Sequence, residues 1–431
     1  MVTAGAAIGV AVGPVWAQPS LPEVTGVELR AVVEEYETDA SVSRFSYRVD
    51  NSAGSLPVDT FSLDLRSDSS REPVSKDGLN DAPGAVLPSS QQYEQGFGPE
   101  GLVASAFPSV PNAWLTGIDA KGRARWSTAD ESEQVSVGAT KDGFVLLSRA
   151  LPGVREAVLE TDLFVFLPNI DEVEDLEAVT AAVDSAGQLV TSVGPVAPPK
   201  DLDLSAFAGE IEGYVTTSAQ EGWIRDASLA AGLSSQLAAL QAALAAGDDS
   251  AAKGLAKAFI DEVDTNACPT FTCPGDPAIT SEGFALLHFN MVFLRSNIPN
   301  SAPVCDAAEA SPDLFWPPDH ALIDVAIINV SDPDGDPLVV SVQSVLSDEA
   351  VDQGGSGNTC PDAVIALDGT LQLRAERAGK LEGRMYEVHF TAADPAGASC
   401  GGTVKTCMPH DESGTATCVE GGLDFDATTC P

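Results

Sequence analysis

The sequence predicts a multidomain β + α protein: an N-terminal antiparallel β-sandwich, a small antiparallel helical bundle and a second β-rich region. Three observations predict this order. The spacing of apolar residues changes from every second position to every third or fourth near residue 203, and β-branched runs return near residue 300. A Pro-rich stretch precedes the first change. All eight cysteines lie in the last 164 of the 431 residues, which sets the C-terminal part apart.

The charge balance restricts the partners that this chain can bind. The chain has 64 acidic residues against 22 Lys and Arg, a formal net charge of -42. Nucleic acids and anionic lipid surfaces need a cationic footprint, so we expect neither as a partner. No stretch after residue 17 reaches about 18 consecutive apolar residues, so no membrane span is expected. A hard cation such as Ca²⁺, which prefers oxygen ligands, is compatible with this composition.

The N-terminus resembles a secretory signal. Residues 1–17 are small and apolar, contain no acid and end in Val15, Trp16 and Ala17, a small-residue cleavage pattern. The alternative is a buried first strand, because the usual positive charges are missing. We therefore expect a signal peptide at 1–17 and a secreted protein, extracellular or at the cell surface.

Residues 24–192 are predicted to form the N-terminal β-sandwich. Apolar and polar residues alternate at 45–49, 61–65 and 135–137, which is typical of strands with one buried face. Turn residues separate these segments and predict seven to nine strands. Trp114 and Trp126 flank a turn, where they either pack in the core or form a platform for stacking sugars.

A Pro-rich linker at 193–202 leads into a helical bundle at 203–299. Apolar residues at helical spacing predict four helices, and short loops between them favour antiparallel neighbours. Asp248 and Asp249 offer an N-cap for the third helix. The apolar positions that mark the helices are Leu204, Phe207, Ile211 and Val215, then Leu229, Leu233, Leu237 and Leu240, then Leu255, Phe259 and Val263, and finally Phe284, Leu287, Met291 and Leu294.

The cysteines indicate disulfides in an oxidising compartment. They are even in number and lie in loop-rich sequence, whereas the tight Cys-x-x-Cys pairs of structural zinc sites are missing. Eight cysteines allow 105 connectivities. Only the pair Cys268 and Cys273, separated by a short loop, is predicted from sequence distance.

The segment 332–336, Asp-Pro-Asp-Gly-Asp, carries the clearest candidate chemistry. Acids at alternate positions around a glycine turn bring Asp332, Asp334 and Asp336 together, which suits the six to eight oxygen ligands of Ca²⁺. An EF-hand is excluded because Gln343 stands where its bidentate Glu is required. The same residues also make a good turn without any metal. Further ligands are expected from neighbouring loops: Asp348, Glu349, Glu376 and Asp394.

Two resemblances refine this outline. Residues 204–298 resemble FIMAH domains, helical spacers of secreted bacterial proteins, in the leucine-rich segment 224–244, the segment 257–263 and a closing helix after residue 280. Residues 300–431 resemble a bacterial immunoglobulin-like or cadherin-like module. This resemblance implies a disulfide-bearing, Ig-like β-sandwich that stabilises, spaces or presents other parts, with structural Ca²⁺ and without enzymatic activity. The matching stretches are 315–320, 332–336, 347–349, 373–377, 383–386, 390–394 and 408–411.

The sequence lacks the common catalytic motifs, and its four histidines (288, 320, 389 and 410) are scattered. We therefore expect a non-catalytic interaction or structural protein that binds a protein or glycan at a cell surface, with no cofactor besides Ca²⁺. The N-terminal sandwich is the candidate recognition unit. A carbohydrate-binding accessory protein or an extracellular hydrolase is the alternative, and a role in a surface layer or filament is a third. The sequence leaves the oligomeric state open.

Overall fold

A computed structural model describes residues 21–37, 39–65, 106–118, 122–161, 186–352, 354–357, 359–367, 369–411, 418 and 421–430. The chain divides into two compact units, each made of two segments. The first comprises Met1–Ala238 and Phe259–Leu294, and the second comprises Ala239–Ala258 and Arg295–Pro431. The helical region, which was expected to be a domain of its own, therefore contributes to both units. The predicted signal peptide at 1–17 lies outside the described residues.

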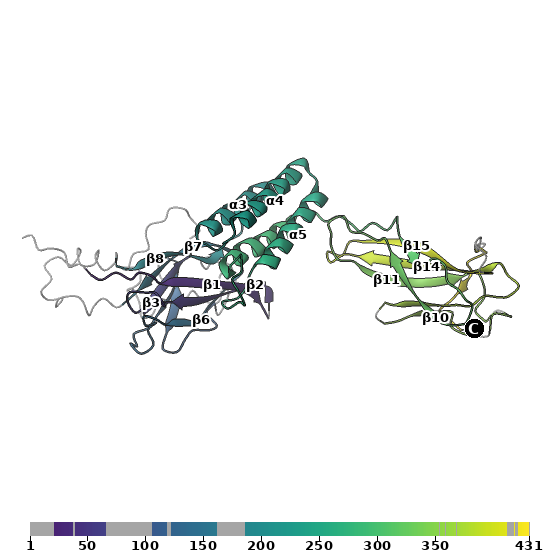
Figure 1. Cartoon of the computed structure of the whole chain (residues 1–431), viewed down its shortest axis with the longest axis horizontal. Coiled ribbons are helices and arrows are strands. Elements are labelled where there is room, and N and C mark those ends of the chain that lie inside the picture. The colour runs from purple at the N-terminus through teal and green to yellow at the C-terminus, as the bar shows by residue number, and fades with distance from the viewer. Residues whose placement is uncertain are drawn as a thin grey trace, which may run out of the picture. The chain divides into compact units, whose positions relative to one another are not determined.

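The described part of the first unit has eight strands in two antiparallel sheets (Figure 1). One sheet has the order β1-β2-β6 and the other β4-β5-β3-β7-β8. The alternating segments 45–49 and 61–65 lie in β2 and β3, with residue 65 directly after β3. The strands are β1 Glu28–Tyr36, β2 Asp39–Asp50, β3 Thr60–Asp64, β4 Leu115–Ile118, β5 Arg123–Ser127, β6 Thr140–Ser148, β7 Leu151–Glu160 and β8 Gln188–Val196.

Both sheets contribute side chains to one hydrophobic core. Alternation along β2 buries Phe45, Tyr47 and Val49, as a period of two requires. Trp126 is fully buried and stacks on Phe61 with 4.7 Å between ring centroids. Trp114 is 3 % exposed and meets Phe144 edge to face. The two tryptophans therefore pack the core and do not form a platform for sugars.

Two boundaries differ from the expected ones. Residues 135–137 are not a strand: Val135 makes only an isolated bridge to Val58, and Val137 is exposed. The linker predicted to start at residue 193 begins later, because residues 193–196 continue β8 alongside β7. Pro195 is tolerated there because β8 is an edge strand. Its carbonyl also accepts a hydrogen bond of 2.8 Å from Arg155 Nε.

The four predicted helices are present in the described chain. Asp203 caps the first, accepting from Ala206 N at 2.9 Å, and Asp248 caps the third, accepting from Ala251 N at 3.1 Å. A π-helical turn interrupts the fourth, which the apolar pattern did not predict. The bounds are α3 Leu204–Gln220, α4 Ala227–Ala246, α5 Asp249–Asn266 and the continuous segment α6 Ser281–Phe284, η5 Ala285–Phe289 and α7 Asn290–Asn297.

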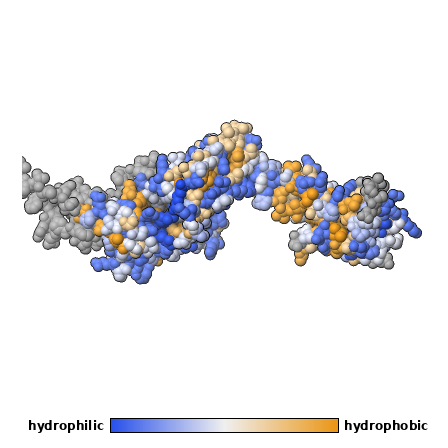
Figure 2. All heavy atoms as spheres, viewed as in Figure 1, coloured by the Kyte–Doolittle hydropathy of each residue, from blue (hydrophilic) through white to orange (hydrophobic). Residues whose placement is uncertain are grey.

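Helix α4 is unusually apolar for a helix that is so little covered. By length and composition it could cross a membrane, although only 17 % of its most apolar 18-residue stretch is buried. Figure 2 shows pale and apolar residues gathered over α3 and α4. One such helix is weak evidence for a membrane span, because it is selected by length and composition only. The expectation of no membrane span therefore remains a prediction.

A buried carboxylate fastens α6 to β1 within the first unit. Glu282 is 1 % exposed, and its Oε1 accepts from Arg30 Nε at 2.7 Å and from Ala31 N at 2.9 Å. Its Oε2 accepts from Thr280 Oγ1 at 2.6 Å. Asn290, also buried, donates to Pro152 O at 2.8 Å. These bonds explain why this helical segment belongs to the same unit as the sheets.

The described part of the second unit also has two antiparallel sheets, ordered β12-β13-β10-β9 and β15-β14-β11-β16 (Figure 1). Residues of both sheets share one core around Tyr386, Val388 and Phe390. The strands are β9 Glu309–Ser311, β10 Leu322–Ile328, β11 Val339–Ser347, β12 Ala363–Ile365, β13 Leu371–Arg374, β14 Gly383–Ala393, β15 Ser399–Pro409 and β16 Phe425–Asp426. The predicted β-rich class is thereby confirmed.

All eight cysteines lie among the described residues and are paired. The predicted bond between Cys268 and Cys273 is confirmed. The three others lie in the second unit, where two of them close loops of 95 and 70 residues. Four disulfides indicate an oxidising, extracellular environment. The other pairs are Cys305–Cys400, Cys360–Cys430 and Cys407–Cys418.

The Glu282 contact predicts that replacing Glu by Gln costs more stability at position 282 than at an exposed position. Glu282→Gln should destabilise the first unit by about 2 kcal/mol, because it removes the buried charge that holds Arg30, which itself keeps some contact with water. Glu34→Gln is the control, since the Glu34–Arg44 pair is about half exposed and should be worth less than about 0.5 kcal/mol. Urea unfolding measures both. Equal effects would contradict this role of Glu282.

Candidate metal centre

The segment 332–336 forms the turn between β10 and β11 in the second unit. Gly335 has a φ of +74°, which a residue with a Cβ rarely adopts. Its N–H donates to Asp332 O at 3.2 Å, and the Asp332 side chain accepts from the N–H groups of Asp334 and Asp336. The backbone thereby turns the three carboxylates toward one another.

The three carboxylates lie close enough to share one cation. One oxygen from each of Asp332, Asp334 and Asp336 lies within 4.8 Å of the others. Asp334 is fully buried, and its Oδ1 has no hydrogen-bond partner among the described residues. Asp332 Oδ2 is also buried and also has no hydrogen-bond partner among the described residues. Two unit charges 4.8 Å apart repel by on the order of 3 kcal/mol at an effective dielectric constant of 20, so the group needs a positive charge.

Part of that charge comes from two residues of the helical segments that belong to the second unit. Lys253 Nζ lies 3.3 Å from Asp334 Oδ2, and its side chain is only 6 % exposed. Arg295 donates to Asp336 Oδ1 at 2.7 Å and to Asp334 O at 3.2 Å. Three carboxylates therefore face two cations, which leaves one negative charge beside the unpartnered oxygens.

Asn300 extends the cluster to the fourth acid. Its Oδ1 accepts from Lys253 Nζ at 2.6 Å, and its Nδ2 donates to Asp394 Oδ2 at 2.8 Å. The hydrogen bond from Asn300, helped by the backbone N–H of Ala398, keeps the pKa of Asp394 below its usual value, although burial acts in the opposite direction. Asp394 therefore favours its ionised form, and Asn300 connects it to Lys253, which contacts Asp334.

The other three predicted ligands lie at the far end of β11. The nine residues of this strand separate the turn from Asp348 and Glu349, a distance of about 30 Å at roughly 3.3 Å per residue. Asp348 accepts from Met385 N at 2.8 Å. Glu349 and Glu376 belong to a different, buried cluster. Asp394 follows β14, whose register places Ala393 opposite Val339, so it returns to the turn.

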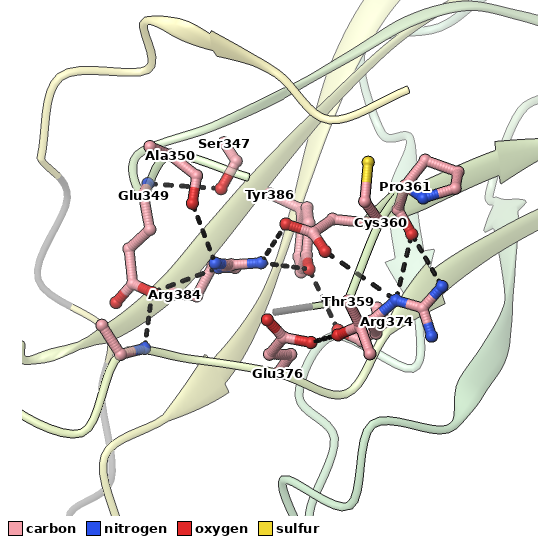
Figure 3. Close-up of polar contacts among 12 residues, drawn as sticks. Ser347, Glu349, Ala350, Thr359, Cys360, Pro361, Arg374, Glu376, Arg384 and Tyr386 are labelled. Carbon is pink, nitrogen blue, oxygen red and sulfur yellow. Dashed lines mark hydrogen bonds and ion pairs between the residues drawn. The ribbon is translucent and has the colours of Figure 1, made fainter. Parts of the chain in front are cut away.

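That second cluster, the Arg384 network, centres on a fully buried guanidinium (Figure 3). Arg384 donates to Glu349 Oε2 at 3.2 Å and also to Asp362 Oδ2. All three side chains are at most 2 % exposed. Tyr386 OH accepts from Arg384 at 3.4 Å and donates to Arg374 O at 3.0 Å. These bonds connect loops at one end of the two sheets.

A third buried acid, Glu376, adjoins the network. Its Oε2 accepts from Thr359 Oγ1 and lies 3.2 Å from Nδ1 of the half-exposed His320. Its Oε1 is unpartnered among the described residues, as is Oε1 of Glu349. Burial, which disfavours the ionised form, raises the pKa of Glu349 and of Asp362 despite the nearby guanidinium. Burial therefore makes the ionised forms of Glu349 and Asp362 less favourable than they are in water.

Sequence reasoning found the turn but not its cationic partners. Lys253 and Arg295 are far from the turn in the chain, and their spacing on α5 and α7 resembles that of ordinary surface charges. Arg384 lies in β14 on the same face as Tyr386, Val388 and Phe390. This alternation is the one feature of the sequence that could have indicated that Arg384 is buried. Asp362 follows a proline in a loop and carried no signal.

The histidines do not assemble a catalytic group among the described residues. His288 Nδ1 lies 2.6 Å from Asp264 Oδ1 and its ring stacks on Phe284. His389 pairs with Glu387 at 3.1 Å, and His410 Nδ1 lies 2.8 Å from Leu381 O. Each contact is local to its own element or its neighbour.

Comparisons with known proteins supply no relative: no family model, curated protein or solved structure matches this chain. The assignment of a function therefore depends on the geometry of these two clusters.

The Arg384 network predicts a large loss of stability on removal of its cation. Arg384→Met should destabilise the second unit by about 3–5 kcal/mol, because Glu349 would lose its buried counter-charge and Asp362 would keep only Arg374, whose Nε lies 3.8 Å away. Lys380→Met, at an exposed position of the same unit, is the matched control and should change little. The calorimetric transition of the second unit measures both. A loss below 1 kcal/mol for Arg384→Met would contradict the account.

The raised pKa values predict a pH dependence. Above the usual carboxyl pKa of about 4, the unfolded chain releases protons that folded Glu349 and Asp362 retain, so their contribution to stability falls as pH rises. Melting temperatures of the wild type and of Glu349→Gln should be measured between pH 4 and pH 8. The two should be similar near pH 4 and differ increasingly as the pH rises, because only the wild type loses the proton of Glu349. Parallel curves would exclude this role for Glu349.

Proposed function

We propose that this chain is a secreted, non-catalytic interaction or structural protein of the extracellular space or cell surface. In this proposal the first unit contains an N-terminal β-sandwich, the helices form a FIMAH-like spacer, and the C-terminal strands form an Ig-like β-sandwich. A structural Ca²⁺ bound at Asp332, Asp334 and Asp336 stabilises that module. The partner is a protein or a glycan at a cell surface, recognised by the N-terminal sandwich.

The observation that carries the calcium site is the state of Asp334. A fully buried carboxylate oxygen without a partner among the described residues is costly. A hard cation at Asp334 Oδ1 and Asp332 Oδ2 would remove that cost and also the repulsion within the triad. Asp336 supplies a third carboxylate, and main-chain carbonyls and water can complete the six to eight ligands of Ca²⁺.

The chemical surroundings support an extracellular setting for such a site. Four disulfides indicate an oxidising compartment. Extracellular modules bind Ca²⁺ with dissociation constants of about 10⁻⁴–10⁻³ M. A site with two cationic side chains beside its carboxylates belongs at the weak end of Ca²⁺ affinities.

The net charge of -42 restricts the partner's chemistry. An acidic surface repels nucleic acids and anionic lipids and favours neutral or basic surfaces. A neutral glycan or a basic patch of a protein at a cell surface is electrostatically compatible with such a chain. Capture of a cell-surface component by the immobilised first unit would test the recognition role directly.

The calcium site predicts saturable binding that depends on one buried acid. Titration calorimetry of the full chain should show one Ca²⁺ site, and calcium should raise the melting temperature of the second unit relative to EDTA. Asp334→Asn should weaken binding at least tenfold, because it removes the buried charge. Asp306→Asn, at an exposed position of the same unit, is the matched control and should bind normally.

Equal melting temperatures in Ca²⁺ and EDTA, together with no heat of binding, would remove calcium from the account. If Asp334→Asn disturbs folding, Asp332→Asn serves as the second variant, because Asp332 is less buried and keeps its turn hydrogen bonds through the amide oxygen.

A further inference from the structure

We propose that Lys253 is a built-in competitor for the calcium site, so that Ca²⁺ and the ammonium group of Lys253 bind Asp334 in alternation. Binding of the metal then breaks the Lys253 side-chain contact between α5 and the turn at 332–336. This inference rests on the proposed calcium site and adds its regulation. All the residues that carry it lie in the second unit.

The position of Lys253 is that of a bound cation and not of a surface charge. Its side chain is 6 % exposed, and Nζ contacts Asp334 Oδ2 at 3.3 Å and Asn300 Oδ1 at 2.6 Å. Both partners are oxygens of the kind that Ca²⁺ prefers. The ammonium group therefore lies among ligands that a divalent cation would use.

Simultaneous occupation is disfavoured by charge. The unpartnered Oδ1 and the Oδ2 that contacts Lys253 belong to the same carboxylate of Asp334. A divalent cation on Oδ1 would thus lie within a few ångströms of a buried ammonium, where water screens poorly. Since Asp334 is fully buried, the repulsion between the two cations lowers the affinity of Asp334 for one of them while the other is bound.

Release of Lys253 also frees a ligand. Asn300 Oδ1 loses its donor and becomes available to the metal, while Asn300 Nδ2 stays on Asp394 at 2.8 Å. Arg295 holds the turn in both states, because it also donates to the backbone oxygen of Asp334. The exchange thus leaves the turn intact and changes only which cation it holds.

The contacts of the turn with α5 are few. Besides Lys253, the hydroxyl of Ser250 donates to Pro333 O at 2.7 Å, at an exposed position. After loss of the Lys253 side-chain contact, three contacts still connect α5 with the turn and with Arg295. They are the Ser250 bond, the Lys257 side chain beside Gly335, and the bond of 3.3 Å from Arg295 Nε to Lys253 O. Calcium therefore loosens the attachment of this part of α5 while it stabilises the turn itself.

The first experiment is Ca²⁺ titration calorimetry of the full chain as wild type, Lys253→Met and Lys405→Met. The proposal expects Lys253→Met to bind Ca²⁺ roughly tenfold more tightly than wild type, within the usual range for coupled sites. Lys405→Met is the matched control: it removes one positive charge of the same unit, but its partner is Glu387 on β14. Its affinity should stay within about twofold of wild type.

The second experiment needs no variant. Acetic anhydride labelling of the wild-type chain, read by mass spectrometry, should leave Lys253 protected in EDTA and make it several-fold more reactive in saturating Ca²⁺. Exposed Lys380 should react equally in both. This readout decides the question even if Lys253→Met folds poorly.

The outcomes separate the two proposals. If neither wild type nor Lys253→Met binds Ca²⁺, the calcium site itself fails. If wild type binds Ca²⁺ while Lys253→Met binds with unchanged affinity and Lys253 stays protected, the site stands and the competition is overturned. Tighter binding by Lys253→Met with calcium-dependent labelling of Lys253 supports the exchange.

Discussion

A carboxylate that leaves water must gain a cation or hydrogen-bond donors, since the cost of burying it is several kcal/mol. In a chain with a net charge of -42, this constraint determines where distant segments meet. Glu282 holds a helical segment to β1 through Arg30 and a backbone N–H. Asp334 holds the start of α5 through Lys253. In both places a Lys or Arg from a distant part of the chain lies beside a buried acid.

The two buried clusters of the second unit satisfy this constraint differently. In the Arg384 network, Arg384 contacts both Glu349 and Asp362, Arg374 lies 3.8 Å from Asp362, and burial raises the pKa of both acids. At the turn 332–336, Lys253 and Arg295 balance two of three carboxylates, while two buried oxygens remain without partners among the described residues. The second cluster suits an added cation, because its acids converge on one point.

Local patterns in the sequence predicted the parts of the structure that depend on local chemistry. Period-two and period-3.6 spacing located β2, β3 and the four helices, and Asp248 was recognised as a cap. The three acids of 332–336 were predicted to converge because they share one turn, and their carboxylate oxygens do lie within 4.8 Å of one another. Asp348 and Glu349 were expected as ligands from a neighbouring loop, but the nine residues of β11 separate them from the turn. Lys253 and Arg295 could not be predicted, because their contacts with the turn arise only from long-range packing.

The central claim is that Asp332 Oδ2 and Asp334 Oδ1 are ligands of a metal ion. A crystal structure of the full chain grown with Ca²⁺ tests it most directly. We expect a metal peak about 2.3–2.6 Å from both oxygens, with Lys253 moved away from Asp334. A structure in millimolar Ca²⁺ that shows no metal there, and Lys253 still bonded to Asp334, would contradict it.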